Sequence, residues 1–333
     1  MKVQLIQRKP AQIHFSVEGY FSRVMDAYTR RNLNIDLKVV PRTSQGLLAR
    51  LEIAQFARRH QGDVTHITGD IHFAALATRP ETTVVTVLDC GRLHQLSGVK
   101  REVFRQLWYK LPLRRLGAIT TISEETKRDL LTWVPELDAS KIHVVPVSVS
   151  PLYKRSPKAF NSKAPRVLQV GTTPNKNIPR LARALRGLSA KLVIVGRVSD
   201  ELAAVLKENA IDYEAMSGIT DEELVAEYVK ADIIAFASTL EGFGMPIIEG
   251  QLVGRPVVTG DRTSMPEVAG QGAVLVDPFS EDSIREGFLR VINDSAFRDE
   301  LLEQGYQNAK RFDTDAIAEK YIQIYEEIGQ RKL

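Results

Sequence analysis

Residues 238–258 read STLEGFGMPIIEGQLVGRPVV, and this stretch decides the fold class. It follows an apolar run at residues 231–237 whose composition is typical of a buried parallel strand. A loop with two glycines comes next, Pro246 suits the first turn of a helix, and Gly254 suits its end. Pro256 then begins another apolar strand. The order of strand, glycine loop, helix and strand predicts an α/β protein with parallel sheets.

The same stretch predicts a nucleotide-sugar site. The first turn of the helix points free N–H groups and a positive dipole end at the glycine loop, and glycines let a ligand approach the backbone, which suits a phosphate. Two carboxylates flank this feature, Glu241 on the loop and Glu249 about one turn inside the helix. A carboxylate repels phosphate but accepts hydrogen bonds from hydroxyl groups. A nucleotide with an attached sugar therefore fits both the glycine loop, through its phosphates, and the two carboxylates, through its hydroxyl groups. The alternative is an ordinary βαβ turn with two solvated glutamates.

This segment resembles the signature of the retaining glycosyltransferases of the family 4 type, which are glycogen-synthase-like enzymes. Their Glu-x7-Glu pattern corresponds to Glu241 and Glu249 around the loop at residues 242–246. The resemblance implies an α/β protein of GT-B architecture, with two Rossmann-like domains whose parallel sheets face each other across a cleft. It covers nearly the whole chain, strongly over residues 170–278 and weakly in the first domain.

The predicted donor domain begins with a strand and turn at residues 166–171, followed by Lys176, which matches a lysine of the family pattern. A lysine at such a turn brings a positive charge to a diphosphate. Many family members also carry an arginine where this chain has Thr172. Arg180 or Arg197 could supply that missing charge.

The resemblance also places the base of the nucleotide near residues 216–218, at the end of a further strand. The predicted donor-binding residues are Gly171, Thr172, Lys176, Met216, Ser217, Gly218, Glu241, Gly242, Phe243, Gly244, Met245, Ile248 and Glu249.

Polar residues at predicted strand ends in the first domain are candidates for the acceptor side. Glu18 and Gly19 lie in a loop predicted at residues 16–20, ahead of a helix that continues to about residue 30. His66 and Asp70 stand at the end of a later strand. The carboxyl ends of parallel strands are where α/β folds bind ligands.

Family members often have His-Asp at the end of the next strand, where this chain has Leu88 and Asp89. The substitution puts the usual role of that histidine in doubt, and His94 could replace it. With Asp89 retained, the catalytic candidates are Glu241, Lys176 and Asp89.

The chain of 333 residues is long enough for two α/β domains, and its 44% hydrophobic and 26% charged residues are typical of a globular protein in water. The predicted organisation is an acceptor-side domain at 1–150, a linker at 151–165, a donor domain at 166–311 and a closing helix at 312–333 that packs back on the first domain. The single cysteine, Cys90, excludes an internal disulfide and favours a reducing compartment. A cytoplasmic protein is expected, with peripheral contact at the inner membrane face as a possibility.

Charge is distributed unevenly along the chain. Residues 1–150 carry 22 Lys or Arg against 14 Asp or Glu, whereas the remainder carries 23 against 27. A basic first half indicates an anionic partner. Within it, residues 100–115 read as a basic amphipathic helix with a tryptophan. Such a helix either contacts an anionic membrane or packs its apolar face on its own domain.

The predicted reaction moves a sugar from a nucleotide-diphosphate sugar, a UDP- or GDP-sugar, to an acceptor hydroxyl with retention of configuration. Lys176 and the amides of residues 242–244 would stabilise the leaving diphosphate, Glu249 would bind the ribose, and Glu241 would hold the transferred sugar. The acceptor would be a glycan or a lipid-linked molecule, as in polysaccharide or glycolipid synthesis. No metal-binding motif appears, so the resemblance implies a metal-independent enzyme with no bound cofactor.

Two alternatives remain open. The substitutions at Leu88 and Thr172 leave room for a nucleotide-sugar-binding protein without turnover, and nucleotide-sugar epimerases share the two-domain architecture. No nucleic-acid recognition motif accompanies the basic charge, so a nucleic-acid partner is not expected.

Overall fold

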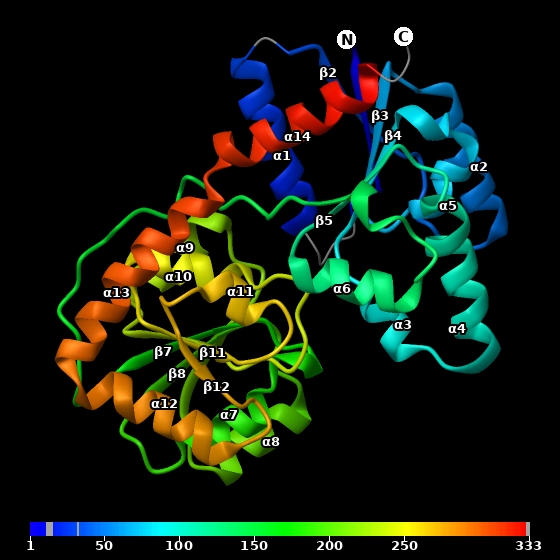
Figure 1. Cartoon of the computed structure of the whole chain (residues 1–333). Helices are drawn as coiled ribbons and strands as arrows, with labels where there is room; N and C mark the ends of the chain where they lie inside the picture. Colours follow the sequence, from blue (N-terminus) through cyan, green and yellow to red (C-terminus); the bar gives the residue numbers. More distant parts are fainter. Residues whose placement is uncertain (11–15, 32, 331–333) are drawn as a thin grey trace. The chain divides into compact units, whose positions relative to one another are not determined.

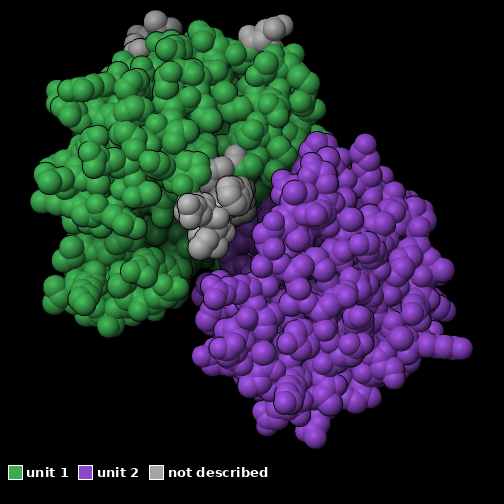
Figure 2. Space-filling view, turned by 180° about the vertical axis from the view of Figure 1, so that it is seen from behind, with its two compact units in different colours: residues 1–148, 312–333 green, residues 149–311 purple. Residues whose placement is uncertain are grey.

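The protein consists of two compact α/β units of similar size (Figures 1 and 2). Unit 1 comprises Met1–Ser148 together with Phe312–Leu333, and unit 2 comprises Val149–Arg311. The structure is a computed structural model that describes residues 1–10, 16–31 and 33–330, with only the backbone described for residues 16–18. Each unit contains a six-stranded parallel sheet, which confirms the predicted α/β class.

The sheet of unit 1 has the strand order β2-β1-β3-β4-β5-β6, and all neighbours are parallel. Its strands are β1 (Val3–Gln7), β2 (Ile35–Val39), β3 (Val64–Thr68), β4 (Thr83–Val87), β5 (Ala118–Thr121) and β6 (Ile142–Val144). The order reverses between β1 and β3, so a topological switch point lies between these two strands.

The helices of unit 1 that precede β6 cover both faces of this sheet. They are α1 (Ser16–Arg30), α2 (Leu47–Arg59), α3 (Gly91–Gln95), α4 (Gly98–Phe104), α5 (Leu111–Leu113) and α6 (Glu124–Trp133), with 3₁₀ turns at His72–Ala77, Pro80–Thr82 and Ala139–Lys141. The loop predicted at residues 16–20 is wrong, because α1 already begins at Ser16. The buried face of α1, with Tyr20, Phe21 and Tyr28, stabilises the helix despite Gly19 in its second turn.

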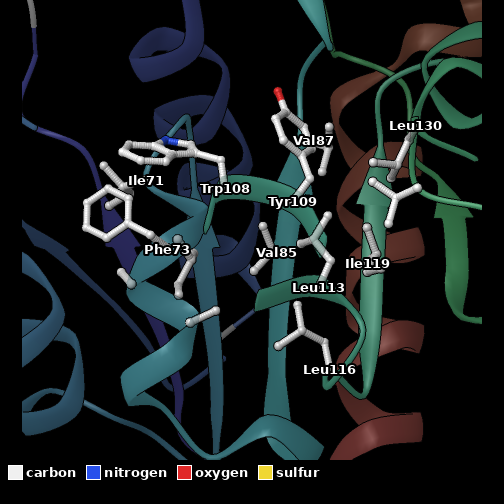
Figure 3. Close-up of a cluster of buried hydrophobic side chains, with 14 of the residues drawn as sticks. Ile71, Phe73, Val85, Val87, Trp108, Tyr109, Leu113, Leu116, Ile119 and Leu130 are labelled. Carbon is white, nitrogen blue, oxygen red and sulfur yellow. The ribbon is translucent and has the colours of Figure 1, made fainter. Parts of the chain in front are cut away.

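The predicted helix at residues 100–115 is not one regular α-helix. It runs from α4 through a π-helical segment, Arg105–Lys110, into α5. Trp108 is buried against Phe73 and donates a hydrogen bond from its indole N–H to the Asp70 carbonyl oxygen at 2.9 Å (Figure 3). The segment therefore packs on its own domain through Trp108, while Val103 and Leu107 on α4 and the π-helical segment stay exposed.

The last helix, α14 (Thr314–Gln330), belongs to unit 1 and packs beside α1 (Figure 1). Its buried residues recur at helical spacing and include Ile317, Tyr321, Tyr325 and Ile328. Ion pairs between Arg30 and Asp315 and between Arg31 and Glu319 join the exposed edges of the two helices at 2.8 and 2.9 Å.

A polar cluster is buried beneath α14. The His66 imidazole is fully buried and forms 2.7 Å hydrogen bonds with the Tyr325 hydroxyl through Nδ1 and with the Thr86 hydroxyl through Nε2. The Tyr20 hydroxyl donates to that of Tyr321 at 2.9 Å. Burial lowers the pKa of His66 to about 3, so the ring is neutral near pH 7.

Unit 2 has the strand order β12-β11-β10-β7-β8-β9, again all parallel. Its strands are β7 (Arg166–Val170), β8 (Lys191–Val195), β9 (Asp212–Met216), β10 (Ile233–Phe236), β11 (Val257–Gly260) and β12 (Val274–Val276). Its helices are α7 (Ile178–Leu185), α8 (Asp200–Glu208), α9 (Asp221–Lys230), α10 (Met245–Val253), α11 (Met265–Ala269), α12 (Glu281–Asn293) and α13 (Ser295–Ala309), with a 3₁₀ turn at Pro174–Lys176. A further 3₁₀ turn, Lys310–Phe312, ends at the first residue of the C-terminal segment of unit 1. The switch point lies between β7 and β10.

Among the helices in the described ranges, none combines the length and the apolar composition needed to cross a bilayer.

Because His66 is buried and neutral, we expect the folded protein to lose stability in mild acid. In the unfolded chain His66 titrates near 6.5, whereas its folded pKa is about 3, so below pH 6.5 protons bind preferentially to the unfolded state. Between pH 7 and 5 this site alone should lower the free energy of unfolding by about 2 kcal/mol. Urea denaturation of wild type and of His66→Asn, which does not titrate, should therefore give a steeper pH dependence for the wild type.

Thr86→Val provides the control, because it removes a hydrogen-bond partner of His66 but leaves the titrating ring in place. It should lower stability at every pH without flattening the pH dependence. Equal slopes for wild type and His66→Asn would contradict the buried, neutral state of this ring.

Candidate nucleotide-sugar site

The predicted donor residues of unit 2 gather at its switch point. The turn after β7 carries Gly171 and Lys176, and the loop after β10 carries Glu241, ahead of the first residue of α10, Met245. Because β7 and β10 are adjacent and parallel, both turns emerge at the same edge of the sheet. This edge is where α/β folds bind ligands, and the N-terminus of α10 adds a positive dipole end there.

The glycine loop is held in one conformation by the segment that follows β11. The Ser264 hydroxyl, which is fully buried, shares its one proton between the carbonyl oxygens of Glu241 at 3.0 Å and Phe243 at 2.7 Å. The Glu241 amide donates to the Thr263 hydroxyl oxygen at 3.2 Å. Gly244 has φ of 121°, and a side chain there would meet Ile247 Cδ1 at 2.9 Å. The loop is thus fixed before any ligand arrives.

An ion pair joins the two turns. Lys176 Nζ lies 2.8 Å from Glu241 Oε1, which also accepts a hydrogen bond from the Asn175 side-chain amide at 3.0 Å. The ammonium lies 4.4 Å from the centre of the Phe236 ring. The aliphatic stem of Lys176 crosses Gly171, which has φ of 87° and where a Cβ would lie 2.9 Å from Lys176 Cε. The positive φ favours glycine at this position, and a side chain there would push the flexible end of Lys176 aside.

Glu249 is recessed in α10, with 8% of its surface exposed. Its Oε2 accepts a 2.5 Å hydrogen bond from the hydroxyl of Tyr228, a buried residue of α9. Burial raises the pKa of Tyr228 far above its ordinary value, so the phenol stays protonated and remains a donor. Ile248 does not fit its predicted role, because its side chain is fully buried in the core.

The other predicted donor residues lie at neighbouring strand ends. Thr172 packs against Gly196 at the end of β8, where a Cβ would lie 2.7 Å from its methyl group. The Arg180 guanidinium already has hydrogen-bond partners within the protein: it donates to Asn177 Oδ1 at 2.7 Å and to the Pro278 carbonyl oxygen at 3.1 Å. Arg197 directly follows Gly196 and is exposed, so it is the better placed of the two arginines to supply the missing charge.

Met216 is the last residue of β9, the edge strand next to β8, and residues 217–218 follow it. The Met216 carbonyl oxygen accepts a 2.7 Å hydrogen bond from the Gly196 amide, which ties this turn to the end of β8. Ser217 and Gly218 are exposed. Within the described parts of the chain, no cluster of three or more His, Cys, Asp or Glu side chains could hold a metal ion.

A cavity of about 940 Å³ opens in unit 1 at the carboxyl ends of β2, β1, β3 and β4. Arg8, Asp70, Leu88 and Asp89 are among its lining residues, and Arg8 forms an ion pair with Asp70 at 3.4 Å. The Asp89 carboxylate accepts a hydrogen bond from the Gly91 amide at 2.8 Å. The pKa of Asp89 is raised because protein surrounds most of the group, although the side chain still reaches the water of the cavity.

The structure does not bring the other residues predicted for the acceptor side to this cavity. His66 lies in the core beneath α14 and cannot reach an acceptor. His94 points to α6, where its Nε2 lies 2.9 Å from Asp129, so it does not replace the missing histidine next to Asp89. Gly19 lies inside α1 rather than in a loop, and the side chain of Glu18 is outside the described part of the structure.

Sequence reasoning missed the residues that support the site. Ser264 and Thr263 lie in a segment that matches the family pattern, but nothing in their spacing reveals that they bond to the glycine loop. Tyr228 reads as one more apolar position of α9. Only the fold brings its hydroxyl to Glu249.

Comparison with known proteins agrees with this geometry. Residues 153–311 match the family described as glycosyl transferases group 1. The chain is 34% identical over 107 residues to O-antigen chain mannosyltransferase B of Escherichia coli, a match that covers 32% of this chain and 28% of the relative. It is 25% identical over 301 residues to the MMP alpha-(1->4)-mannosyltransferase of Mycolicibacterium hassiacum, covering 81% of this chain and 71% of that one.

Among solved structures, Anabaena Alr3699/HepE in complex with UDP and glucose superposes with a TM-score of 0.78 at 16% identity, covering 97% of this chain and 99% of that chain. The two units with parallel sheets and this likeness define a protein of the GT-B class. Together the findings support a GT-B glycosyltransferase of the group 1, or family 4, type, and the resemblance found in the sequence is confirmed.

The contacts of Ser264 predict that its loss loosens the glycine loop. Ser264→Ala removes the one buried donor that two carbonyl oxygens share and should lower the free energy of unfolding by about 1–3 kcal/mol. Hydrogen exchange of the amides in residues 241–245 should become faster. The control is Ser199→Ala, which removes the cap of α8 at a cost of about 1 kcal/mol. Unchanged exchange in Ser264→Ala, or equal acceleration in both variants, would contradict the role of Ser264.

Proposed function

We propose that the protein transfers a sugar from a nucleotide-diphosphate sugar to an acceptor hydroxyl, with retention of configuration. The observation that carries this proposal is the Lys176–Glu241 pair at the switch point of unit 2, beside the N-terminus of α10. It combines a cation for a diphosphate with a carboxylate for sugar hydroxyls, and a fixed glycine loop lies between Glu241 and the helix.

The roles follow from this geometry. An incoming diphosphate competes with Glu241 for the Lys176 ammonium, and it also meets the backbone amides at the start of α10. As the bond to the sugar breaks, Lys176 stabilises the charge that develops on the leaving diphosphate. The released Glu241 carboxylate then binds hydroxyl groups of the transferred sugar and stabilises its positive charge. Glu249, oriented by Tyr228, accepts hydrogen bonds from the ribose hydroxyls.

The donor we infer first is a mannosyl nucleotide, because two of the relatives are named as mannosyltransferases. A UDP-sugar is the second candidate, since the structural neighbour holds UDP and glucose. We infer that no metal is needed, because Lys176 and the helix dipole supply positive charge where a metal ion would otherwise act. The departing phosphate oxygen takes the proton of the acceptor hydroxyl on the same face of the sugar, which gives retention.

The acceptor binds to unit 1, where Asp70 and Asp89 lie in the cavity at the strand ends. We place the product in polysaccharide or glycolipid synthesis, in accordance with the O-antigen enzyme among the relatives. The basic residues of unit 1 support peripheral contact with an anionic membrane, which salt-sensitive binding to anionic vesicles would test.

A glycine substitution tests the position of Lys176. Gly171→Ala and Gly187→Ala both place a side chain at positive φ, 87° and 75°, so both should cost about 1 kcal/mol of stability. Only the methyl group at position 171 meets Lys176, whereas position 187 has open space. Calorimetry with UDP and GDP should therefore show at least about tenfold weaker nucleotide binding for Gly171→Ala alone. Equal affinities in the two variants would exclude Lys176 from the phosphate site.

Turnover tests the reaction itself. Wild-type protein given GDP-mannose or UDP-glucose should release free sugar slowly, and it should form product faster when an acceptor is added. Both reactions should proceed in the presence of EDTA. The NMR spectrum of the product should show the anomeric configuration of the donor. Glu241→Gln should lower turnover by about 10²–10³-fold while nucleotide binding persists. The control is Glu281→Gln, an exposed glutamate of unit 2 that pairs with Arg183. Nucleotide binding without turnover would favour a binding protein, and inverted product would exclude the retaining mechanism.

A further inference from the structure

The cavity of unit 1 has two kinds of wall. The loops after β1 and β2 and the start of α2 contribute cations, and α4 with the π-helical segment contributes apolar side chains. All of it lies within unit 1, at the carboxyl ends of four parallel strands that include the switch point between β1 and β3. Its basic lining residues are Arg8, Lys9, Arg42, Arg50, Arg92 and Lys100, against the two acidic residues Asp70 and Asp89.

Arg50 is the central cation of this cavity. Its guanidinium lies over the indole ring of Trp108, 4.6 Å from the ring centre, and Figure 3 shows this ring beside Phe73 and Ile71. Its Nε is buried, and among the described residues the guanidinium has neither a hydrogen bond nor an ion pair. A buried donor without a partner is costly, so an anion from outside the chain would stabilise Arg50 by accepting its hydrogen bonds.

The other cations differ in how far they are already paired. Arg8 is paired with Asp70, and Arg42 with Glu52 at 2.5 Å. Lys100 is exposed and has no ion pair within the described chain. The cavity therefore keeps an excess of positive charge after its internal pairs are counted, which suits a phosphate.

The opposite wall is apolar and open to water. Val99, Val103 and Leu107 line the cavity at successive helical turns and are 79%, 52% and 41% exposed. Leu47 and Leu48, in the first turn of the helix that carries Arg50, are 71% and 82% exposed but are not among the lining residues. The three bulky apolar side chains of the opposite wall mark a site for an apolar partner.

We propose that this cavity binds the phosphate of a lipid-linked acceptor, with the hydrocarbon chain of that lipid against the apolar wall. The inference rests on the proposed glycosyl transfer and identifies the acceptor class. A soluble glycan would leave the apolar wall exposed and Arg50 without an anion, and a free phosphate would use only the cationic side. A phosphate joined to a hydrocarbon chain satisfies both walls at once, since each half meets a wall of matching chemistry.

The test uses the full chain and phosphatidylcholine vesicles that contain farnesyl phosphate, with binding measured by sedimentation. The protein should bind these vesicles at least about tenfold more tightly than vesicles containing farnesol. Inorganic phosphate at the same concentration should not displace it. Displacement by inorganic phosphate, or equal binding to both kinds of vesicle, would overturn the proposal.

Matched variants separate a built site from general attraction to negative charge. Arg50→Gln should weaken binding at least about tenfold, while Arg58→Gln, an exposed arginine of the same helix that does not line the cavity, should leave it unchanged. Val99→Asp should also weaken binding, and Leu152→Asp, in unit 2, should not. Equal effects of the two arginine variants would overturn the proposal, as would tight binding by Val99→Asp.

Nucleotide binding by the same preparations distinguishes this inference from the proposed function. Vesicle binding that fails while GDP or UDP still binds overturns the lipid-phosphate site and leaves the donor site standing. Loss of nucleotide binding in the wild type would instead contradict the proposed glycosyl transfer.

Discussion

The Lys176–Glu241 ion pair is the contact on which the candidate donor site depends. It connects two turns that are 65 residues apart in sequence and adjacent only because β7 pairs with β10. Both side chains are mostly shielded from water, so their attraction is stronger than that of an exposed pair. Neither charge is needed to hold the sheet together. The pair is better understood as a resting state, in which each group holds its partner in place until the diphosphate and the sugar bind.

The surroundings of this pair explain why so much of the neighbouring chain is glycine or small. In the turn after β7, Lys176 crosses Gly171, whose φ of 87° favours glycine and where a side chain would displace the end of the lysine. The loop after β10 reaches α10 through Gly244, whose φ of 121° is strained for other residues. Ser264 then fixes the carbonyl groups of the loop, so its conformation does not depend on the ligand. A loop fixed in advance loses less entropy when it binds, which is an advantage at a catalytic site.

The sequence predicted those parts of the molecule that depend on local patterns. The helix α10, its start after the glycine loop and its end at Gly254, with φ of 82°, follow from residue types alone. The start of α1 did not, because Gly19 indicates a loop unless one knows that Tyr20 and Phe21 are buried beside it. The position of His66 depends on Tyr325, a residue 259 positions away, so no local pattern could show that α14 covers it. Contacts of this kind are set by tertiary packing, and a single sequence does not contain them in readable form.

The two units use the same kind of six-stranded parallel sheet, with different strand orders, for two chemistries. In unit 2 the turns at the switch point contain glycines and are fixed by buried hydrogen bonds, so the backbone itself faces the ligand. In unit 1 the cavity at the strand ends presents side chains instead: a stacked arginine, two carboxylates and an apolar wall. A nucleotide-diphosphate sugar has the same phosphate and ribose groups whatever sugar it carries, and a fixed backbone suits such an unchanging ligand. Acceptors differ in charge and in apolar character, so side chains that can change without disturbing the sheet are the appropriate means of selecting among them.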